Sequence, residues 1–255
     1  MPIFAGICIL AFYGFKITNT QTLLALDTVY ISKSFDSPSK SSEMAVNYSV
    51  QVSVPFVSAT VNQGLRDEFN KLIIRTYLGD EYVELPPKEA VESYIKDEIE
   101  HLKKHDKIST RNVYTKNIAN ALVVNDRIIS FENFVAKNMG TLKQASNYTN
   151  FDFKSGRVLQ LEDIFIKGYE KKLKQNIIRS LGATYYNKMH QKLSEYKLLS
   201  LEQHLVSPDN FRITNEGISF QYDLPDWFEQ TIGEVDITIP YKKLSELLND
   251  KYSLI

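Results

Sequence analysis

The sequence predicts an α+β fold, built as two mixed subdomains with mainly antiparallel sheets and packed helices. Segments whose apolar residues recur at every second position, as in half-buried strands, occur beside segments with the spacing of amphipathic helices. These segments follow no regular strand–helix–strand order, which argues against a doubly wound parallel sheet. The chain has 255 residues, 43 % of them hydrophobic, and a chain of this size builds a sizeable core without disulfides or metals.

The beginning of the chain has the pattern of an export signal. Ile3–Phe15 is an apolar run that is shorter than the about 20 residues of a membrane-spanning helix and has the length of a signal-peptide centre. We therefore expect residues 1–20 to be a signal-like segment and the protein to be exported, to the periplasm or cell surface of a bacterium. The alternative is a buried N-terminal strand or helix. Cys8, the only cysteine, lies inside the run, so we expect no lipid anchor there.

Residues 21–45 are predicted to be a linker. The stretch Ser32–Glu43 consists mostly of serine, lysine and proline, which favours a flexible tether between the export signal and the first domain.

An N-terminal α+β domain is predicted over residues 46–143. Its first strand has strict alternation, and two amphipathic stretches and a β-branched region follow. The expected elements are a strand over Tyr48–Phe56, a helix capped by Thr60 and Gln63, a helix after Pro86-Pro87, and strands within Asn112–Ala136 that turn at Asn125-Asp126-Arg127.

A C-terminal α+β domain is predicted over residues 144–255, with short strands, turns rich in glycine and asparagine, and several helices. The expected elements are a strand pair over Tyr148–Leu161 that turns at Lys154-Ser155-Gly156, helices over Asp163–Leu181 and Tyr185–Leu199, a strand pair over Phe211–Tyr222 that turns at Asn215-Glu216-Gly217, a strand over Val235–Ile239, and a helix over Tyr241–Leu248.

Three stretches of the C-terminal half carry a resemblance to a known family. Asn150–Phe165, Asp209–Tyr222 and Gly233–Leu244 resemble a bacterial envelope domain of unknown function. That domain forms the C-terminal half of the lysozyme-binding anti-sigma factor RsiV and also lies beside the catalytic domain of the peptidoglycan deacetylase PdaC. Val46–Lys143 looks like the companion N-terminal domain. The resemblance implies an exported, envelope-associated α+β protein with no agreed enzymatic role.

The common catalytic and cofactor motifs are missing from the sequence. No two of the ten glycines lie within two residues of each other, so glycine-rich phosphate loops and the G-x-S-x-G elbow are absent. His101 and His105 stand one helical turn apart, but two imidazoles alone make a weak metal site, and a solvated helix face is the simpler interpretation. We predict no catalytic residue, cofactor or metal. The net charge of −1 also gives no field for nucleic-acid binding.

The predicted partner-binding residues lie around the only tryptophan. Asp223, Asp226 and Glu229 surround Trp227 and Phe228 in what the sequence suggests is an acidic loop. Such a loop suits a basic protein such as lysozyme, or the face of a sugar. Two alternatives stay open: Trp227 fills a core while the carboxylates are solvated, or a carboxylate pair performs acid–base chemistry.

A basic run on one expected helix has two interpretations. It is a solvated helix face, or it contacts an anionic polymer of the envelope. The run comprises Lys167, Lys171, Lys172, Lys174 and Arg179.

These patterns together favour an exported, non-catalytic binding or sensing module of the cell envelope. Its expected partner is an envelope protein, lysozyme-like in chemistry, or a cell-wall glycan, and we expect no membrane span in the mature chain. The alternative function is a peptidoglycan-directed hydrolase or deacetylase with a site between the two domains.

Overall fold

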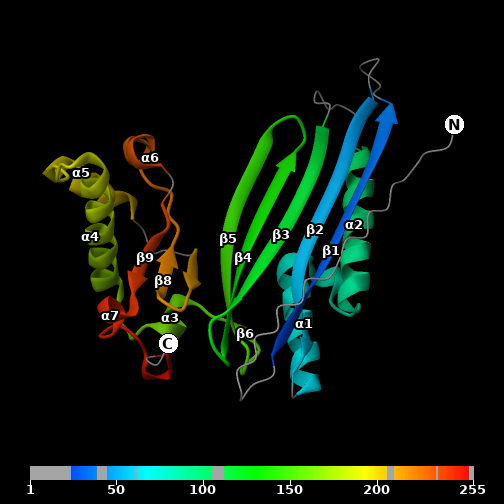
Figure 1. Cartoon of the computed structure of the whole chain (residues 1–255), viewed down its shortest axis with the longest axis horizontal. Coiled ribbons are helices and arrows are strands. Elements are labelled where there is room, and N and C mark those ends of the chain that lie inside the picture. Colours follow the sequence, from blue (N-terminus) through cyan, green and yellow to red (C-terminus); the bar gives the residue numbers. More distant parts are fainter. Residues whose placement is uncertain are drawn as a thin grey trace. The chain divides into compact units, whose positions relative to one another are not determined.

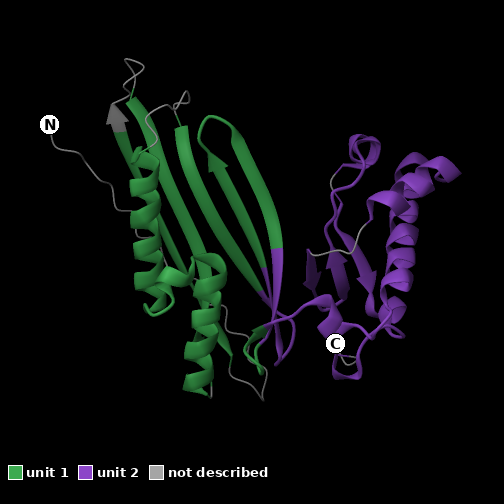
Figure 2. Cartoon of the chain, turned by 180° about the vertical axis from the view of Figure 1, so that it is seen from behind, with its two compact units in different colours: residues 1–121, 132–147, 153–157 green, residues 122–131, 148–152, 158–255 purple. Residues whose placement is uncertain are grey.

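The computed structural model describes residues 24–38, 45–60, 62–104, 112–205, 210–233 and 235–252. The predicted signal-like segment, residues 1–20, lies outside them. The chain divides into two compact units, one comprising residues 1–121, 132–147 and 153–157, and the other residues 122–131, 148–152 and 158–255 (Figure 2). Strands and helices occur in both units and the strand pairing is mostly antiparallel, so the predicted α+β class is confirmed.

The first unit contains most of a six-stranded sheet with the order β1-β2-β3-β4-β5-β6 (Figure 1). Its strands are β1 (Ala25–Pro38), β2 (Ala45–Ala59), β3 (Asn112–Val123), β4 (Ile128–Asn138), β5 (Leu142–Asp152) and β6 (Arg157–Val158). β1 and β2 are antiparallel, whereas β2 and β3 are parallel. A parallel pair needs a crossover, which α1 (Gln63–Tyr77), a short 3-10 helix η1 (Asp80–Tyr82) and α2 (Pro87–Lys104) provide.

The predicted strand around Tyr48–Phe56 is confirmed and is the centre of this unit. Val50, Val52 and Val54 are fully buried, while the residues between them are only half-buried. This period of two places the valines on the face that α1 and α2 cover.

The two predicted helices of this unit are confirmed, with one correction at the start of the first. α1 is capped by Asn62, whose Oδ1 accepts a hydrogen bond from the backbone N–H of Leu65 at 3.1 Å, and not by Thr60. Asn is a preferred cap because its side-chain oxygen reaches the otherwise unpaired N–H groups of the first turn. α2 starts at Pro87, where a missing N–H costs nothing.

The predicted linker is wrong for residues 25–38, which form β1. Alternation explains the strand: Val29 and Ile31 lie opposite Val54 and Val52 of β2. Phe35 stacks on Tyr48 with ring centroids 5.0 Å apart. The serines and lysines between these apolar residues made the stretch resemble a tether, although their spacing is that of a strand.

The second unit has a three-stranded antiparallel sheet with the order β7-β8-β9 (Figure 1). Its elements are α3 (Leu161–Ile164), α4 (Glu170–Met189), α5 (Glu195–His204), β7 (Phe211–Ile213), β8 (Gly217–Phe220), α6 (Asp226–Ile232), β9 (Ile237–Pro240), α7 (Tyr241–Leu244) and a final 3-10 helix η2 (Asp250–Tyr252). α4 packs on β9, and one apolar core fills the unit.

The turns of this unit confirm the predicted strand pairs, but the predicted helix boundaries are wrong. The expected helix over Asp163–Leu181 is broken near Gly168, which has a φ of +83°. α4 then continues through the expected gap before Tyr185 and ends where His190 adopts a left-handed conformation. The last helix ends at Leu244. Chain reversals at these points interrupt apolar spacing that is otherwise continuous in sequence.

No helix in the described ranges has both the length and the apolar character needed to cross a membrane.

Candidate functional site

The predicted acidic loop begins as an extended segment and continues as helix α6. Asp226 is the first residue of this helix and Glu229 lies in its first turn, so both carboxylates interact favourably with the helix dipole. Glu229 Oε1 also accepts a hydrogen bond from the backbone N–H of Leu224 at 3.3 Å. Asp223, Asp226 and Glu229 are exposed. Their carboxylates therefore mark the start of a helix and lie on its solvated side.

The two aromatic residues of α6 have different environments. Phe228 is 0 % exposed and belongs to the core of the second unit, so it is not accessible to a partner. Trp227 is half-buried, and its Nε1–H donates a hydrogen bond to Ser200 Oγ of α5 at 3.2 Å. Its ring meets the Tyr185 ring of α4 edge to face, with centroids 6.3 Å apart. Trp227 thus joins α4, α5 and α6.

A lysine from α5 completes this aromatic arrangement. Lys197 Nζ lies 4.8 Å from the Tyr185 ring centroid and 4.9 Å from that of Trp227. It also donates a hydrogen bond to the Tyr185 hydroxyl at 2.7 Å. Contacts with two ring faces and one oxygen fix the position of a cation that would otherwise be mobile.

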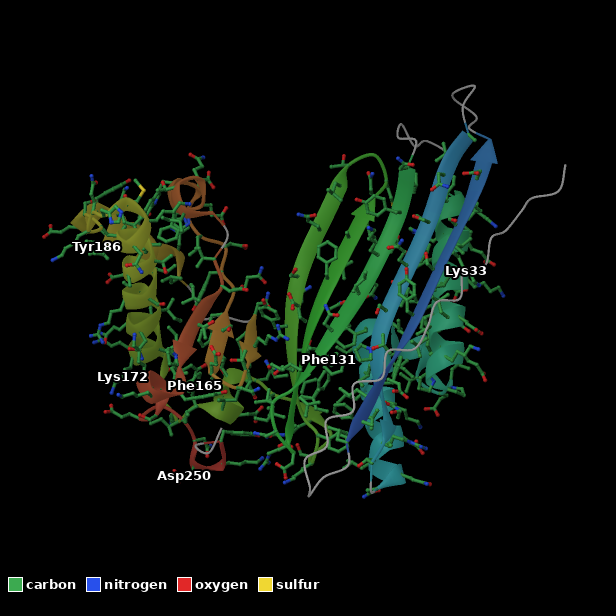
Figure 3. All side chains as sticks on the ribbon, in the orientation of Figure 1. Lys33, Phe131, Phe165, Lys172, Tyr186 and Asp250 are labelled. Carbon is green, nitrogen blue, oxygen red and sulfur yellow. The ribbon has the colours of Figure 1, made fainter. Side chains whose placement is uncertain are left out.

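Exposed apolar side chains also occur on α4 and α5, the two helices that Trp227 contacts. Of the seven large exposed apolar residues in the described part of the chain, four fall within residues 186–199, at the end of α4 and on α5 (Figures 1 and 3). They are Tyr186, 50 % exposed, Met189, 38 %, Tyr196, 79 %, and Leu199, 53 %. We call these four residues and Trp227 the aromatic surface. Single exposed apolar residues need no explanation, whereas large contiguous apolar patches are typical of interaction sites.

Sequence reasoning found Trp227 but missed the rest of the aromatic surface. It placed Tyr185–Leu199 on one helix, whereas α4 ends at Met189 and α5 starts at Glu195. Tyr196 and Leu199, three residues apart, share one exposed face of α5, whereas Leu201 is buried. Had the end of α4 and the start of α5 been predicted correctly, the spacing of Tyr196 and Leu199 would have indicated an exposed apolar face.

The histidines form no cluster among the described residues. His101, His190 and His204 are exposed, and His105 lies outside the described part of the chain. His204 Nδ1 lies 3.0 Å from the backbone oxygen of Ser200. Within the described ranges, no group of three His, Cys, Asp or Glu side chains is placed to hold a metal ion.

The first unit contains a cavity of about 440 Å³ between α1, the end of β2 and the start of α2. Val57, Ile74 and Pro86 are among the apolar residues that line it. Its charged residues form ion pairs at the rim: Lys71 with Glu84 at 3.0 Å, and Arg66 with Asp67 at 2.8 Å. The Lys71 pKa is raised by the hydrogen bond to Glu84. These pairs are exposed to water.

The predicted basic run lies mainly on the solvated side of α4. Lys171, Lys172 and Arg179 are exposed. Lys172 forms an ion pair with Glu246, and its hydrogen bond lowers the pKa of that carboxyl. The pairing indicates a solvated helix face at this position.

A family model matches part of the second unit. Residues 162–242 match the model of a family described as "Protein of unknown function (DUF3298)". This range contains α4, α5 and α6, and therefore the whole aromatic surface. None of the curated proteins matches the chain.

Two solved structures share the fold over most of the chain. A DUF3298 family member from Bacteroides fragilis has a TM-score of 0.67 and 18 % identity, with 89 % of this chain and 94 % of that chain covered. A DUF3298 family protein from Pseudomonas aeruginosa has a TM-score of 0.59 and 14 % identity, with 88 % and 95 % covered. The chain therefore contains a DUF3298 domain, a domain of unknown function, within the fold that these two structures share.

Proposed function

We propose that this chain is a non-catalytic binding module of the bacterial cell envelope, and that it recognises a protein partner through the aromatic surface. The observation that carries the proposal is the concentration of Tyr186, Tyr196 and Leu199 as exposed side chains beside the half-buried Trp227. Large apolar side chains cost free energy when they face water, and a partner that covers them removes that cost.

The chemistry of the surface favours a protein over a glycan. Tyrosine, tryptophan and methionine are enriched at the centres of protein interfaces. Glycans need converging polar groups to pair their hydroxyls, whereas Met189 and Leu199 offer only apolar contact. The exposed carboxylates Asp223, Asp226 and Glu229 lie beside the cations Lys188 and Lys197, so this end of the unit carries charges of both signs. The carboxylates offer ion pairs to a basic partner, and lysozyme is a protein of that kind.

The beginning of the chain supports the envelope part of this proposal. The apolar run Ile3–Phe15 and the resemblance to envelope proteins both favour a location outside the cytoplasm. Expression of the full chain in a bacterium, with mass spectrometry of the mature N-terminus, tests this step. A product from which the first twenty or so residues have been removed supports export. An intact N-terminus in the cytoplasmic fraction contradicts it.

The binding step is tested with lysozyme as the probe and calorimetric titration as the readout. We expect lysozyme to bind the chain, and the double variant Tyr196→Ser/Leu199→Ser to weaken binding by about tenfold or more, since central apolar residues carry most of the binding free energy. Leu142→Ser/Ile166→Ser is a matched control, because both residues are exposed apolar residues outside the aromatic surface. The control is expected to bind like wild type.

Three results would overturn this proposal. The first is the absence of any heat of binding or heat-stability shift with lysozyme, since a partner that binds only the folded state must stabilise it. The second is equal weakening by the double variant and its control. The third is binding of peptidoglycan fragments that the double variant abolishes, which would reassign the surface to a glycan. Turnover of those fragments would favour the hydrolase or deacetylase alternative instead.

A further inference from the structure

We propose that the outer edge of β1 pairs with β1 of a second copy of this chain, in an antiparallel arrangement centred on Tyr30. β1 has 14 residues and lies at the end of the six-stranded sheet. On one side it pairs with β2 along its whole length, and no described strand pairs with its other side. Every second residue of β1 therefore directs a backbone N–H and C=O away from the sheet.

Such a long edge is unusual, because natural sheets avoid unpaired edges with short strands, bulges or proline. β6, at the other end of this sheet, has only two residues. In β1 the register shift lies at Ala25/Leu26 and the proline is the last residue, Pro38. The stretch from Asp27 to Lys33 between them is regular. It is long enough for a strand pair, since strands of about five or six residues are typical.

The charges on this stretch select one partner and one register. Residues directly opposite in an antiparallel ladder are both hydrogen-bonded or both not hydrogen-bonded. A strand that pairs with its own copy about a two-fold axis must therefore centre on a residue. Only a centre at Tyr30 places Asp27 opposite Lys33, and symmetry makes this pair occur twice. Centres at Asp27 or at Lys33 would instead oppose like charges, which is unfavourable.

The remaining pairs in this register are also compatible. Val29 lies opposite Ile31 twice, and Tyr30 lies opposite its own copy. Val29 and Ile31 share a face with the buried Val54 and Val52 of β2, so pairing extends an apolar face that already exists. Asp27 and Lys33 are exposed, and Lys33 projects from β1 in Figure 3. Tyr30 is 39 % exposed. In this register the edge of β1 is therefore complementary to the same edge of a second copy, with opposite charges and apolar side chains paired.

The test is the oligomeric state of the full chain, measured by sedimentation and light scattering over a range of concentrations. We expect wild type to dimerise and Asp27→Lys to be monomeric, because two lysine pairs then face each other. Lys33→Asp is expected to be monomeric for the corresponding reason. Both positions are exposed, so circular dichroism is expected to show unchanged folding. Asp36→Lys is a matched control on the same strand outside the charge pairs, and it is expected to dimerise.

Two rescue experiments separate this register from any other interface. The double variant Asp27→Lys/Lys33→Asp restores two opposite-charge pairs and is expected to dimerise again. A mixture of the two single variants is expected to form a heterodimer, since each chain then offers one sign of charge. A monomeric wild type at all accessible concentrations would overturn the proposal. Dimers that persist in both single variants, or a failure of both rescues, would also overturn it.

Discussion

Replacement of Asn150 by alanine tests the buried polar contacts that hold the second unit together. Asn150 is 1 % exposed at the end of β5. Its Oδ1 accepts a hydrogen bond from the backbone N–H of Ile213 at 2.8 Å, and its Nδ2 donates one to the backbone oxygen of Phe211 at 2.7 Å. The Ser130 hydroxyl lies 2.7 Å from both Asn150 Oδ1 and the Ile213 oxygen. One amide side chain therefore pairs with both an N–H and a C=O group on the edge of β7 that faces away from β8.

The expected cost follows from the groups that alanine would leave without a partner. The N–H of Ile213 and the oxygen of Phe211 belong to residues that are 0 % and 4 % exposed, so water cannot replace the amide without local opening. An unpaired buried polar group costs about 1–3 kcal/mol. Two such groups predict that Asn150→Ala lowers the free energy of unfolding by about 4 kcal/mol.

The assay is urea unfolding followed by the fluorescence of Trp227, which lies in the second unit. Asn147→Ala is the matched control, because Asn147 is exposed on the same strand, and we expect it to change stability by less than about 0.5 kcal/mol. Hydrogen exchange at the Ile213 amide is a second readout, expected to accelerate in Asn150→Ala. If the two variants unfold at the same urea concentration, the buried amide does not hold β7 and our reasoning is refuted.

Two further predictions concern the pH dependence of the first unit and the packing of the second. Burial, followed by the charge of Glu98, raises the pKa of Tyr94 to about 12. The unfolded chain therefore loses the phenol proton first, and the free energy of unfolding should fall by about 2 kcal/mol between pH 10 and pH 12. Urea unfolding monitored by circular dichroism should show a smaller fall in Tyr94→Phe, and an equal fall would contradict this cause. A Cβ at Gly217 would collide with the backbone of β9, so Gly217→Ala should lower the melting temperature markedly. Gly182→Ala, on α4 with its nearest neighbour atom at 3.8 Å, should leave it unchanged or raise it, and a similar loss in both would disprove the clash.

Period and turn chemistry predicted the parts of the fold that depend on local sequence. The hairpin at Asn125-Asp126-Arg127 is an example. Asn125 Oδ1 accepts hydrogen bonds from the backbone N–H groups of Arg127 and Ile128 at 2.9 and 2.8 Å, a local device that asparagine favours wherever it occurs. The alternation of β2 is equally local, because one face of the strand is buried and the other is not.

The misses involve features that depend on distant parts of the chain. β1 is a strand because β2 offers it a long antiparallel edge, and Ser32–Pro38 alone carries too little apolar area to indicate one. The break between α4 and α5 depends on a left-handed His190, a conformation that histidine adopts more often than most residues but still in only a small minority of cases. The break also sets the orientation of α5, and hence which of its apolar residues face water. Trp227 could therefore be identified from the sequence, but the four exposed residues beside it could not.

The motif that carried the family resemblance has a structural explanation. Asn150, Phe151 and Asp152 end β5, where successive side chains point to opposite faces, and Phe153 begins the turn that follows. The two polar residues of the motif are both buried, Asn150 against β7 and Asp152 in an ion pair with Arg127 at 2.7 Å. The two phenylalanines meet aromatic rings of β4 and α1 edge to face. Each of the four side chains therefore packs against other residues or pairs with them. The motif thus serves packing and hydrogen bonding, and its four residues precede residues 162–242, which match the family model. The aromatic surface lies inside the matched range on α4, α5 and α6, where its exposed side chains serve no packing role of that kind. We therefore expect substitutions in the motif to lower stability, and substitutions on the aromatic surface to leave the fold intact.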